Sequence, residues 1–427
     1  MRTQLVRAGA LALLLVVLAL SVSLVVRDGH VPRAVGLPHT GTVYDNGSLG
    51  DMRDTLYYPG RALLSGHDPY DVPGTWARYP TTNWLPLYTP DHLLLGAALS
   101  LMPFPVAGAV WTLVNVGLLF GLAWLAVRSA VRRPEPAAVL LVAAVVLASR
   151  PGRDTFVSGQ TTLVYCAATW LAWAWSGAWS GARSATTGVQ TRPWPAAIAL
   201  AIALTKPPFG LPLLVLLMAQ RQWRTVVRGL GLCAAASLPV VIVLLASAGP
   251  ARLLGDLRTN LAITRSSVPD RLGGVRRVDA ASLLARLLPD VVPATALELG
   301  TAVSVLVLAV FALERARRLG APPAVPAAVA AAAVVLAVPH QSYDLLLLAA
   351  PLCGLAVGRV RLPVAVTAGL VLVIAALPAG VLLRLVGRPD DLPAVTSVTS
   401  AAVLLLLLAG VTALRRPTSE VLRPAPV

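Results

Sequence analysis

The sequence predicts an all-α polytopic membrane protein, a bundle of about twelve spanning helices in one integral domain that covers residues 1–427. Three observations predict this class. Mean hydropathy is +0.75. Hydrophobic residues make up 57% of the chain and charged residues only 13%, far from the mixture of a soluble domain. Apolar runs of about 17–24 residues recur between Arg, Pro and Gly, and that length matches the apolar core of a bilayer.

The apolar runs give the predicted spans in order. We interpret the first as a retained helix rather than a signal peptide, because it is longer than a usual signal core and no small-x-small cleavage site follows. Two later runs, 194–205 and 209–220, are short for a span. The predicted spans are 8–26, 105–127, 136–149, 161–177, 194–205, 209–220, 228–248, 292–313, 323–338, 343–357, 363–383 and 394–414.

Arginine predicts the orientation of the bundle. An even number of spans places both termini on one side, and arginine clusters in every connection on that side, which the positive-inside rule makes cytoplasmic. The net charge of +16 therefore reflects topology, and no nucleic-acid partner is expected, since no basic patch is interleaved with aromatic residues. The predicted cytoplasmic arginines include Arg128, Arg132 and Arg133, then Arg221, Arg224 and Arg228, then Arg315, Arg317 and Arg318, and Arg415, Arg416 and Arg423 in the tail at 415–427.

Two long connections are predicted on the extracytoplasmic side, at 27–104 and 249–291. The first holds a predicted amphipathic helix at 55–65 and a second apolar piece at 92–102. That piece is too short to span, so we expect it to lie at the outer interface. If it did span, every later segment would reverse its direction.

Polar residues gather at the predicted extracytoplasmic helix ends, and charged groups near the membrane are costly enough to indicate function. They form four clusters: Asp51 to Asp54 with Tyr57, Tyr58 and Arg61; Arg150 and Arg153 running on to Gly159 and Gln160; Lys206 within 205–208; and Pro339 to Asp344, which contains His340 and Tyr343.

Asp51 and Asp54 are the candidate catalytic residues. A carboxylate in a partly dry cleft can act as a general base towards a hydroxyl group. On an α-helix, residues three apart lie on neighbouring turns of one face. The alternative interpretation is that both are solvated loop charges, or that Asp54 caps the helix that follows it.

Lys206 is the single lysine among 35 basic residues. Together with Arg150, Arg153 and His340 it predicts a cationic site for the phosphate of an anionic lipid head group. The alternative is that the arginines anchor helix ends and that His340 is a satisfied interfacial histidine. The histidines have no zinc-ligand spacing, so no metal site is predicted. No cofactor is established, and a divalent metal is neither required nor excluded.

A series of short motifs, in order along roughly residues 45–350, resembles family 87 of the GT-C glycosyltransferases. The landmarks are Asp51, Tyr57-Tyr58, Arg61-Ala62-Leu63-Leu64, Gly66, Asp68-Pro69-Tyr70-Asp71, Tyr79-Pro80, Trp111, Asn115, Gly159-Gln160, Lys206-Pro207 and Pro339-His340 with Ser342-Tyr343-Asp344. The match departs in the spacing from the acid to Tyr57 and Arg61, and at Thr81 to Trp84, where a second Pro and aliphatic residues are usual.

The resemblance implies a GT-C-like helix bundle and an inverting hexosyltransferase. Such an enzyme would move mannose, or alternatively arabinofuranose, from a polyprenyl-phosphate donor to a glycolipid or glycan acceptor at the outer face of the plasma membrane. Asp51 matches the catalytic carboxylate best and Asp54 second. Lys206, Arg150, Arg153 and His340 would contact the donor phosphate. The implied substrate-binding residues are Tyr57, Tyr58, Arg61, Asp68, Tyr70, Gln160, Tyr343 and Asp344.

Two other functions compete with this one. A flippase or transporter for lipid-linked sugars would carry charged or broken-helix sites near the bilayer midplane. Glu298 and Pro239 are the interruptions that stand out in the apolar runs here, which weakens this alternative. A non-catalytic assembly partner would leave the acidic extracytoplasmic segments unexplained.

Overall fold

A computed structural model of the chain describes residues 49–130, 134–178, 192–267, 271–274, 276–289, 292–321, 324–357 and 392–413. These residues form no β-strand, only one isolated antiparallel bridge between Arg277 and Gln341. The predicted all-α membrane class is confirmed. The helices are α2 (Gly50–Met52), the π-helical turn η1 (Arg53–Tyr57), α3 (Tyr58–Leu64), α4 (Val72–Arg78), α5 (His92–Ser100), α6 (Phe104–Ala130), α7 (Pro136–Ala148), α8 (Arg150–Ser158), α9 (Thr162–Trp175), α11 (Pro193–Leu204), α12 (Pro207–Ala219), α13 (Trp223–Ala248), α14 (Pro250–Ser266), α15 (Ala280–Leu287), α16 (Ala294–Arg318), α17 (Ala324–Ala337), the 3-10 helix η3 (Ser342–Leu348), α18 (Ala349–Val357) and α21 (Leu392–Ala413).

Four described helices are long and apolar enough to cross a membrane: α6, α13, α16 and α21. A fifth span results if α7 and α8, which meet at a bend of 74°, count as one. The helices α11 and α12 have 12 and 13 residues. At 1.5 Å per residue each is about 20 Å long, shorter than the bilayer core. A count of about twelve spans is therefore not established, and the predicted spans at 8–26 and 363–383 lie outside the described residues.

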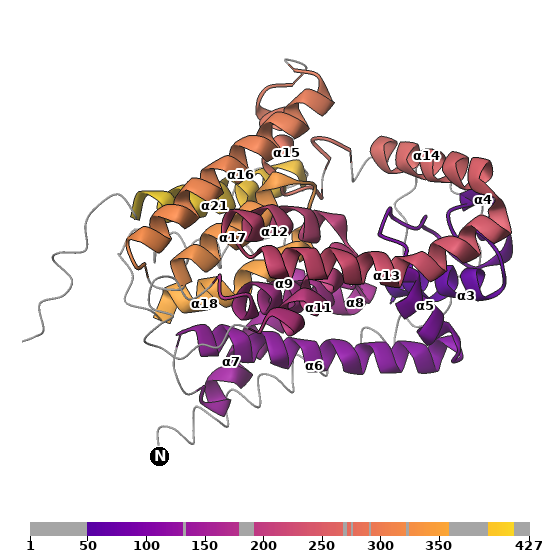
Figure 1. Ribbon diagram of the computed structural model, residues 1–427, viewed down its shortest axis with the longest axis horizontal. Helices are drawn as coiled ribbons and strands as arrows, with labels where there is room; N and C mark the ends of the chain where they lie inside the picture. Colours follow the sequence, from indigo (N-terminus) through magenta and orange to yellow (C-terminus); the bar gives the residue numbers. More distant parts are fainter. Residues whose placement is uncertain are drawn as a thin grey trace, which may run out of the picture.

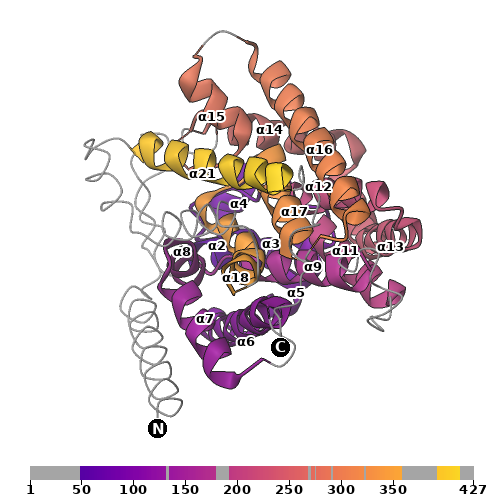
Figure 2. The same ribbon diagram turned by 90° about the vertical axis from the view of Figure 1, so that its left-hand side faces the viewer.

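Alanine-rich α17 forms the centre of the bundle. Every one of its residues except Pro326 is buried, and it packs against α16, α21, α12 and α18 (Figure 2). Small side chains allow this close approach between helices. The long helices α6 and α13 run along the long axis of the molecule (Figure 1), and they expose large apolar side chains such as Leu113 and Ile242. These two helices offer an apolar surface to lipid.

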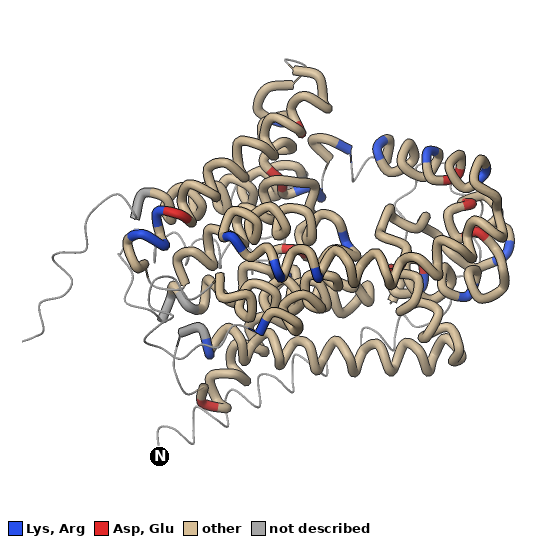
Figure 3. The backbone as a smooth tube through the Cα atoms, in the orientation of Figure 1, with Lys and Arg blue, Asp and Glu red and all other residues tan. Residues whose placement is uncertain are grey.

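The two ends of the long axis differ in what they carry. The helices α3, α5 and α14 lie at one end, and α16 finishes towards the other with Arg315, Arg317 and Arg318 in its last turn (Figure 1). Charged residues are scarce along α6 between these ends (Figure 3). We call the end that holds the first connection the polar end.

The apolar piece predicted at 92–102 forms the short helix α5, which is not among the long spans. It has nine residues and packs against α3 and η1. The predicted amphipathic helix at 55–65 is present, but it begins earlier, at Gly50, and contains the π-helical turn η1. Asp51 and Asp54 therefore lie within a helix, and Asp54 does not cap one.

Two glycines let α3 and α5 cross in contact. A Cβ atom at Gly60 would overlap the backbone of Gly96, and one at Gly96 would overlap the carbonyl oxygen of Leu56. Because backbone atoms cannot move aside as a flexible side chain can, we expect Gly60→Ala to cost about 1–3 kcal/mol of stability. Thermal unfolding of the purified protein in detergent measures this loss. Gly117→Ala is the matched control, since nothing lies within 4 Å of its added Cβ. Equal midpoints for the two variants would contradict the contact.

Candidate active site

The turn at residues 157–160 docks the first connection onto the bundle. Leu49 donates its backbone N–H to the carbonyl of Val157 (2.7 Å), and the Trp111 indole N–H donates to the carbonyl of Gly159 (2.8 Å). Gly159 has φ +68° and ends α8, and a Cβ atom there would press against Met52. Only glycine suits both the left-handed backbone and the close approach. The Gly159-Gln160 landmark thus lies where the two parts of the chain meet.

Asp51 and Gln160 form the first contact of the candidate site. The Gln160 amide donates to a carboxylate oxygen of Asp51. Gln160 is buried, whereas Asp51 is partly exposed at the start of the helix. The contact joins residues far apart in the chain and leaves the carboxylate within reach of solvent.

Asp54 has a different environment. Its carboxylate is 1% exposed and forms a two-point ion pair with the neighbouring Arg53, at 2.7 and 3.0 Å. It also accepts the backbone N–H groups of Thr82 and Asn83 at 3.2 and 3.0 Å, and the Thr82 hydroxyl at 2.9 Å. Asp54 therefore fastens the segment at 82–83 to the helix.

Asp344 forms a buried network with two other predicted site residues, Lys206 and His340. Its carboxylate pairs with the Lys206 ammonium at 2.8 Å and lies 2.9 Å from Nδ1 of His340. The Thr162 hydroxyl donates to it at 3.1 Å. The Lys206 ammonium also lies 4.8 Å from the ring centroid of Phe209. Lys206 is thus enclosed by a carboxylate and aromatic faces, an arrangement that holds a cation away from water.

Gln160 and Thr162 connect the two networks. Gln160 contacts Asp51, and Thr162, two residues later at the start of α9, contacts Asp344. Asp344 in turn holds Lys206. The predicted acidic and cationic residues from four separate stretches therefore lie at the same end of the bundle.

The two arginines of α8 are not part of the Lys206–Asp344 ion pair. Arg150 is 7% exposed, yet among the described residues its Nε and Nη2 atoms have no hydrogen-bond partner, and neither has Nε of Arg153. Buried guanidinium nitrogens are normally hydrogen-bonded. Helix α8 packs against η3, so these arginines lie beside the segment that holds Asp344. These guanidinium donors are thus left without an acceptor among the described residues.

The remaining predicted substrate residues lie in three places. Tyr57 is buried and donates to the carbonyl of Met102 (2.8 Å), while Tyr58 is partly exposed and Arg61 is exposed on the same helix. Tyr70 instead packs with residues of α13 and α14, in an apolar cluster separate from the one around Asp51. Asp68 lies beside it and accepts the backbone N–H of Tyr70 at 2.8 Å. The structure does not bring Asp68 and Tyr70 to the Asp51–Gln160 contact. Tyr343 is next to Asp344 and its ring centroid lies 5.3 Å from the Lys206 ammonium.

His92 is a residue whose importance the sequence does not reveal. It is fully buried at the start of α5, where Nδ1 lies 2.9 Å from the Tyr165 hydroxyl and Nε2 lies 2.8 Å from the carbonyl of Thr55. Burial lowers the pKa of His92 to about 4, so the imidazole is neutral at neutral pH. It ties the first connection to α9. A lone histidine ahead of an apolar run carries no signal of such a role.

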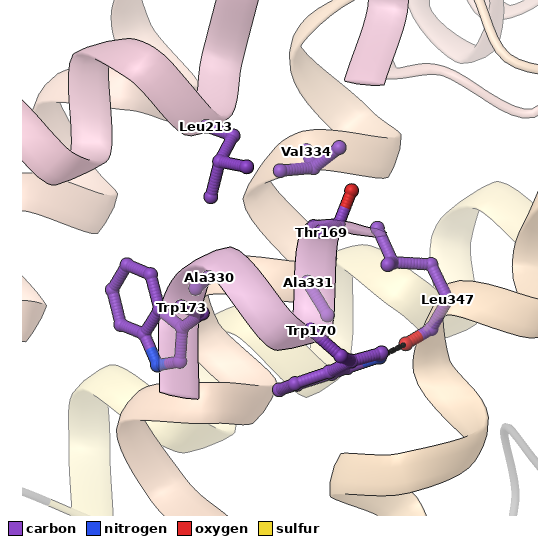
Figure 4. A pocket seen from close by; sticks show the side chains of 8 residues that line it. All are labelled: Thr169, Trp170, Trp173, Leu213, Ala330, Ala331, Val334 and Leu347. Atoms are coloured by element: carbon purple, nitrogen blue, oxygen red, sulfur yellow. Dashed lines mark hydrogen bonds between the residues drawn. The ribbon is translucent and has the colours of Figure 1, made fainter. Parts of the chain in front are cut away.

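The bundle also contains a very small cavity, with a volume of about 10 Å³. In Figure 4 it lies between α9, α12, α17 and η3, and the Trp170 indole N–H donates to the carbonyl of Leu347 (3.0 Å). The lining is mostly apolar: Thr169, Trp170, Trp173, Leu213, Ala330, Ala331, Val334 and Leu347. This cavity offers no reacting groups. Within the described part of the chain, no three His, Cys, Asp or Glu residues are placed to hold a metal ion.

Asp68 gives the fold a testable pH dependence. It is 9% exposed, and burial, with the nearby charges of Asp256 and Asp71, raises its pKa to about 6 from 3.8. Between these two pH values the folded chain binds a proton more tightly than the unfolded chain, so stability falls as pH rises through this window. We expect Asp68→Asn to stabilise the protein at pH 7.5 by up to about 2 kcal/mol and to have little effect at pH 4.

Thermal unfolding between pH 4 and 8 measures this difference. Asp71→Asn is the control, because Asp71 caps α4 through the Gly74 N–H and pairs with Arg252 at 2.9 Å, so its loss should destabilise. If the Asp68→Asn variant were less stable than the native protein by the same amount at every pH, the expectation would be contradicted.

The sequence was compared with models of protein families, with curated proteins and with solved structures. The model of glycosyltransferase family 87 matches residues 87–339, more than half of the chain. The matched range contains Gln160, Lys206 and Arg150, and it ends just before His340. No curated protein and no solved structure matched in the same comparisons. The chain therefore belongs to glycosyltransferase family 87 and is a membrane glycosyltransferase.

Proposed function

We propose that the protein transfers mannose, or alternatively arabinofuranose, from a polyprenyl-phosphate donor to a hydroxyl of a lipid or polysaccharide acceptor at the outer face of the plasma membrane, with inversion. One observation carries this proposal. A partly exposed carboxylate, Asp51, and a buried guanidinium with unsatisfied donors, Arg150, belong to segments that meet at the turn 157–160.

Asp51 is the proposed general base. It takes the proton of the acceptor hydroxyl as the acceptor oxygen forms a bond to the anomeric carbon. The bond from that carbon to the phosphate oxygen breaks, and its electron pair leaves with the polyprenyl phosphate. Asp54 suits this role less well, because its carboxylate is buried and saturated by Arg53, Thr82 and Asn83.

Arg150 and Arg153 are the proposed direct partners of the donor phosphate. The phosphate is a singly charged diester in the donor and becomes a monoester that can carry a second negative charge as it leaves. Donors placed where charge develops favour the transition state over the ground state. The two unsatisfied nitrogens of Arg150 suit this purpose because no described protein group competes for them.

Lys206 and His340 are proposed to support the phosphate site mainly by holding Asp344 and the segment around it in place. Both hold Asp344, and Asp344 also accepts the N–H of Gln341 at 3.1 Å. The segment at 340–344 is thereby fixed beside α8. Gln160 is proposed to orient Asp51, and Tyr58 and Arg61, which follow Asp51 on the same helix, are proposed to contact the acceptor.

The proposed location of the site at the outer face depends on how the helix bundle is oriented in the membrane. With the arginine-rich end of α6 and α16 in the cytoplasm, the polar end faces outwards. Nucleotide sugars do not reach that side, so the donor must be carried by a lipid. Cysteine labelling tests the orientation: we expect a cysteine in place of Asp71 to react with a membrane-impermeant reagent added outside, and one in place of Arg317 not to react. The reverse pattern would exclude an outer site.

A transfer assay tests the function. The full-length protein, reconstituted in liposomes, is given a radiolabelled polyprenyl-phosphate mannose or arabinofuranose and a membrane extract as acceptor. We expect label in a glycolipid or glycan from the lipid-linked donors and none from nucleotide sugars. Movement of the intact donor across the bilayer without covalent transfer would instead indicate a flippase.

A further inference from the structure

The second long connection is bound to the candidate site through its backbone. Arg277 and Gln341 form the isolated antiparallel bridge, and Val278 donates its N–H to the carbonyl of His340 at 2.9 Å. His340 belongs to the Asp344 network. The turn that precedes Arg277 is therefore placed directly beside the polar residues of η3.

Buried charges fix the shape of this turn. The Arg286 guanidinium donates from Nη2 to the carbonyls of Gly274 and Arg277, both at 2.7 Å. Arg277 is 4% exposed and forms a two-point pair with Asp279 at 2.8 and 3.0 Å. It also pairs with Glu298, at the start of α16, at 2.7 Å. The backbone is thus held on both sides of Arg276.

Arg276 itself differs from its neighbour. Its side chain is exposed, and no carboxylate of the described residues pairs with it. It lies within electrostatic range of Asp154 on α8, as do Arg150 and Arg153. Three guanidinium groups therefore act electrostatically on one carboxylate, which leaves an excess of positive charge in this region.

We propose that Arg276 is a third arginine of the donor phosphate site and that the second long connection positions it opposite α8. This inference rests on the proposed function. Arg150 and Arg153 approach the phosphate from α8, and Arg276 approaches from the connection, so the departing phosphate is held from two sides. Arginine suits the position because its planar group can bind two phosphate oxygens together.

Binding of polyprenyl monophosphate, the product of the proposed reaction, tests Arg276 without relying on transfer activity. The dissociation constant is measured on the purified full-length protein in detergent, with polyprenol as the probe that lacks a phosphate. We expect Arg276→Gln to raise the dissociation constant for the phosphate about tenfold and to leave polyprenol binding unchanged. Arg276→Lys, which keeps a charge but not the planar group, should lie between Arg276→Gln and the native protein.

Arg265→Gln is the matched control, because Arg265 is an exposed arginine of the same connection, on α14. It should bind within twofold of the native protein. In the transfer assay Arg276→Gln should raise the KM for the donor and leave the KM for the acceptor unchanged.

The outcomes separate the two proposals. If the native protein binds polyprenyl monophosphate no better than polyprenol, the proposed function fails. If the native protein does discriminate but Arg276→Gln binds like Arg265→Gln, only the role of Arg276 is overturned. Unfolding of the Arg276→Gln variant would also overturn it, since an exposed side chain that only binds substrate should not be needed for folding.

Discussion

Replacing Asp51 by asparagine is expected to lower the rate of sugar transfer by about 10²–10⁴-fold, the contribution of a positioned general base. The asparagine side chain retains an oxygen that can accept the Gln160 hydrogen bond, so the helix should keep its place. What it loses is the capacity to take a proton from the acceptor hydroxyl. The loss should appear in kcat, with the KM for the donor nearly unchanged, and thermal unfolding should match that of the native protein.

Asp54→Asn is the comparison that separates chemistry from structure. Asp54 holds Arg53, Thr82 and Asn83, so its replacement leaves a buried guanidinium without its counter-charge. We expect this variant to lose stability. Transfer by Asp51→Asn within twofold of the native rate would exclude Asp51 as the base. A selective loss of kcat in a stable Asp54→Asn protein would move the role to Asp54.

The second large effect is expected from Asp344→Asn. Lys206 and Asp344 are 6% and 2% exposed, so removal of the carboxylate leaves an ammonium buried without a counter-charge. Breaking a buried ion pair in this way costs about 3–5 kcal/mol. We expect a corresponding fall in the thermal unfolding midpoint, together with loss of activity as the segment at 340–344 loosens.

A double-mutant cycle provides the control for this pair. Lys206→Met removes the ammonium but keeps a long apolar side chain to lie against Phe209 and Tyr343. The double variant Lys206→Met with Asp344→Asn should be more stable than the sum of the two single losses predicts, because it leaves neither charge unpaired. Additive losses would show that the two side chains do not depend on each other.

The helices could be predicted from the sequence because apolar runs reveal themselves locally. The run at 228–248 lies within α13, and the run at 105–127 lies within α6. The convergence of polar residues also followed from topology, since alternate connections of a helix bundle meet at the same end. The number and the length of the membrane spans could not be predicted as well. Apolar composition does not distinguish a full span from a helix as short as α11.

The partners of the polar residues could not be predicted. Asp51 contacts Gln160 and Lys206 contacts Asp344, pairs separated by 109 and 138 positions in the chain. Such contacts depend on how α9, α12 and η3 pack, and no local pattern records that. For the same reason Asp54 stood as a close second to Asp51, although its carboxylate is buried and held by Arg53, Thr82 and Asn83.

The π-helical turn at 53–57 has a consequence for the way related chains are compared. A π turn admits one more residue than an α turn, while α2 and α3 on either side keep ordinary winding. The helix can therefore gain or lose one position between its acidic start and its tyrosines without being broken. The unusual interval between Asp51 and Tyr57 then need not signal a different enzyme. In chains with another interval, the carboxylate equivalent to Asp51 would be identified by its glutamine neighbour rather than by counting residues.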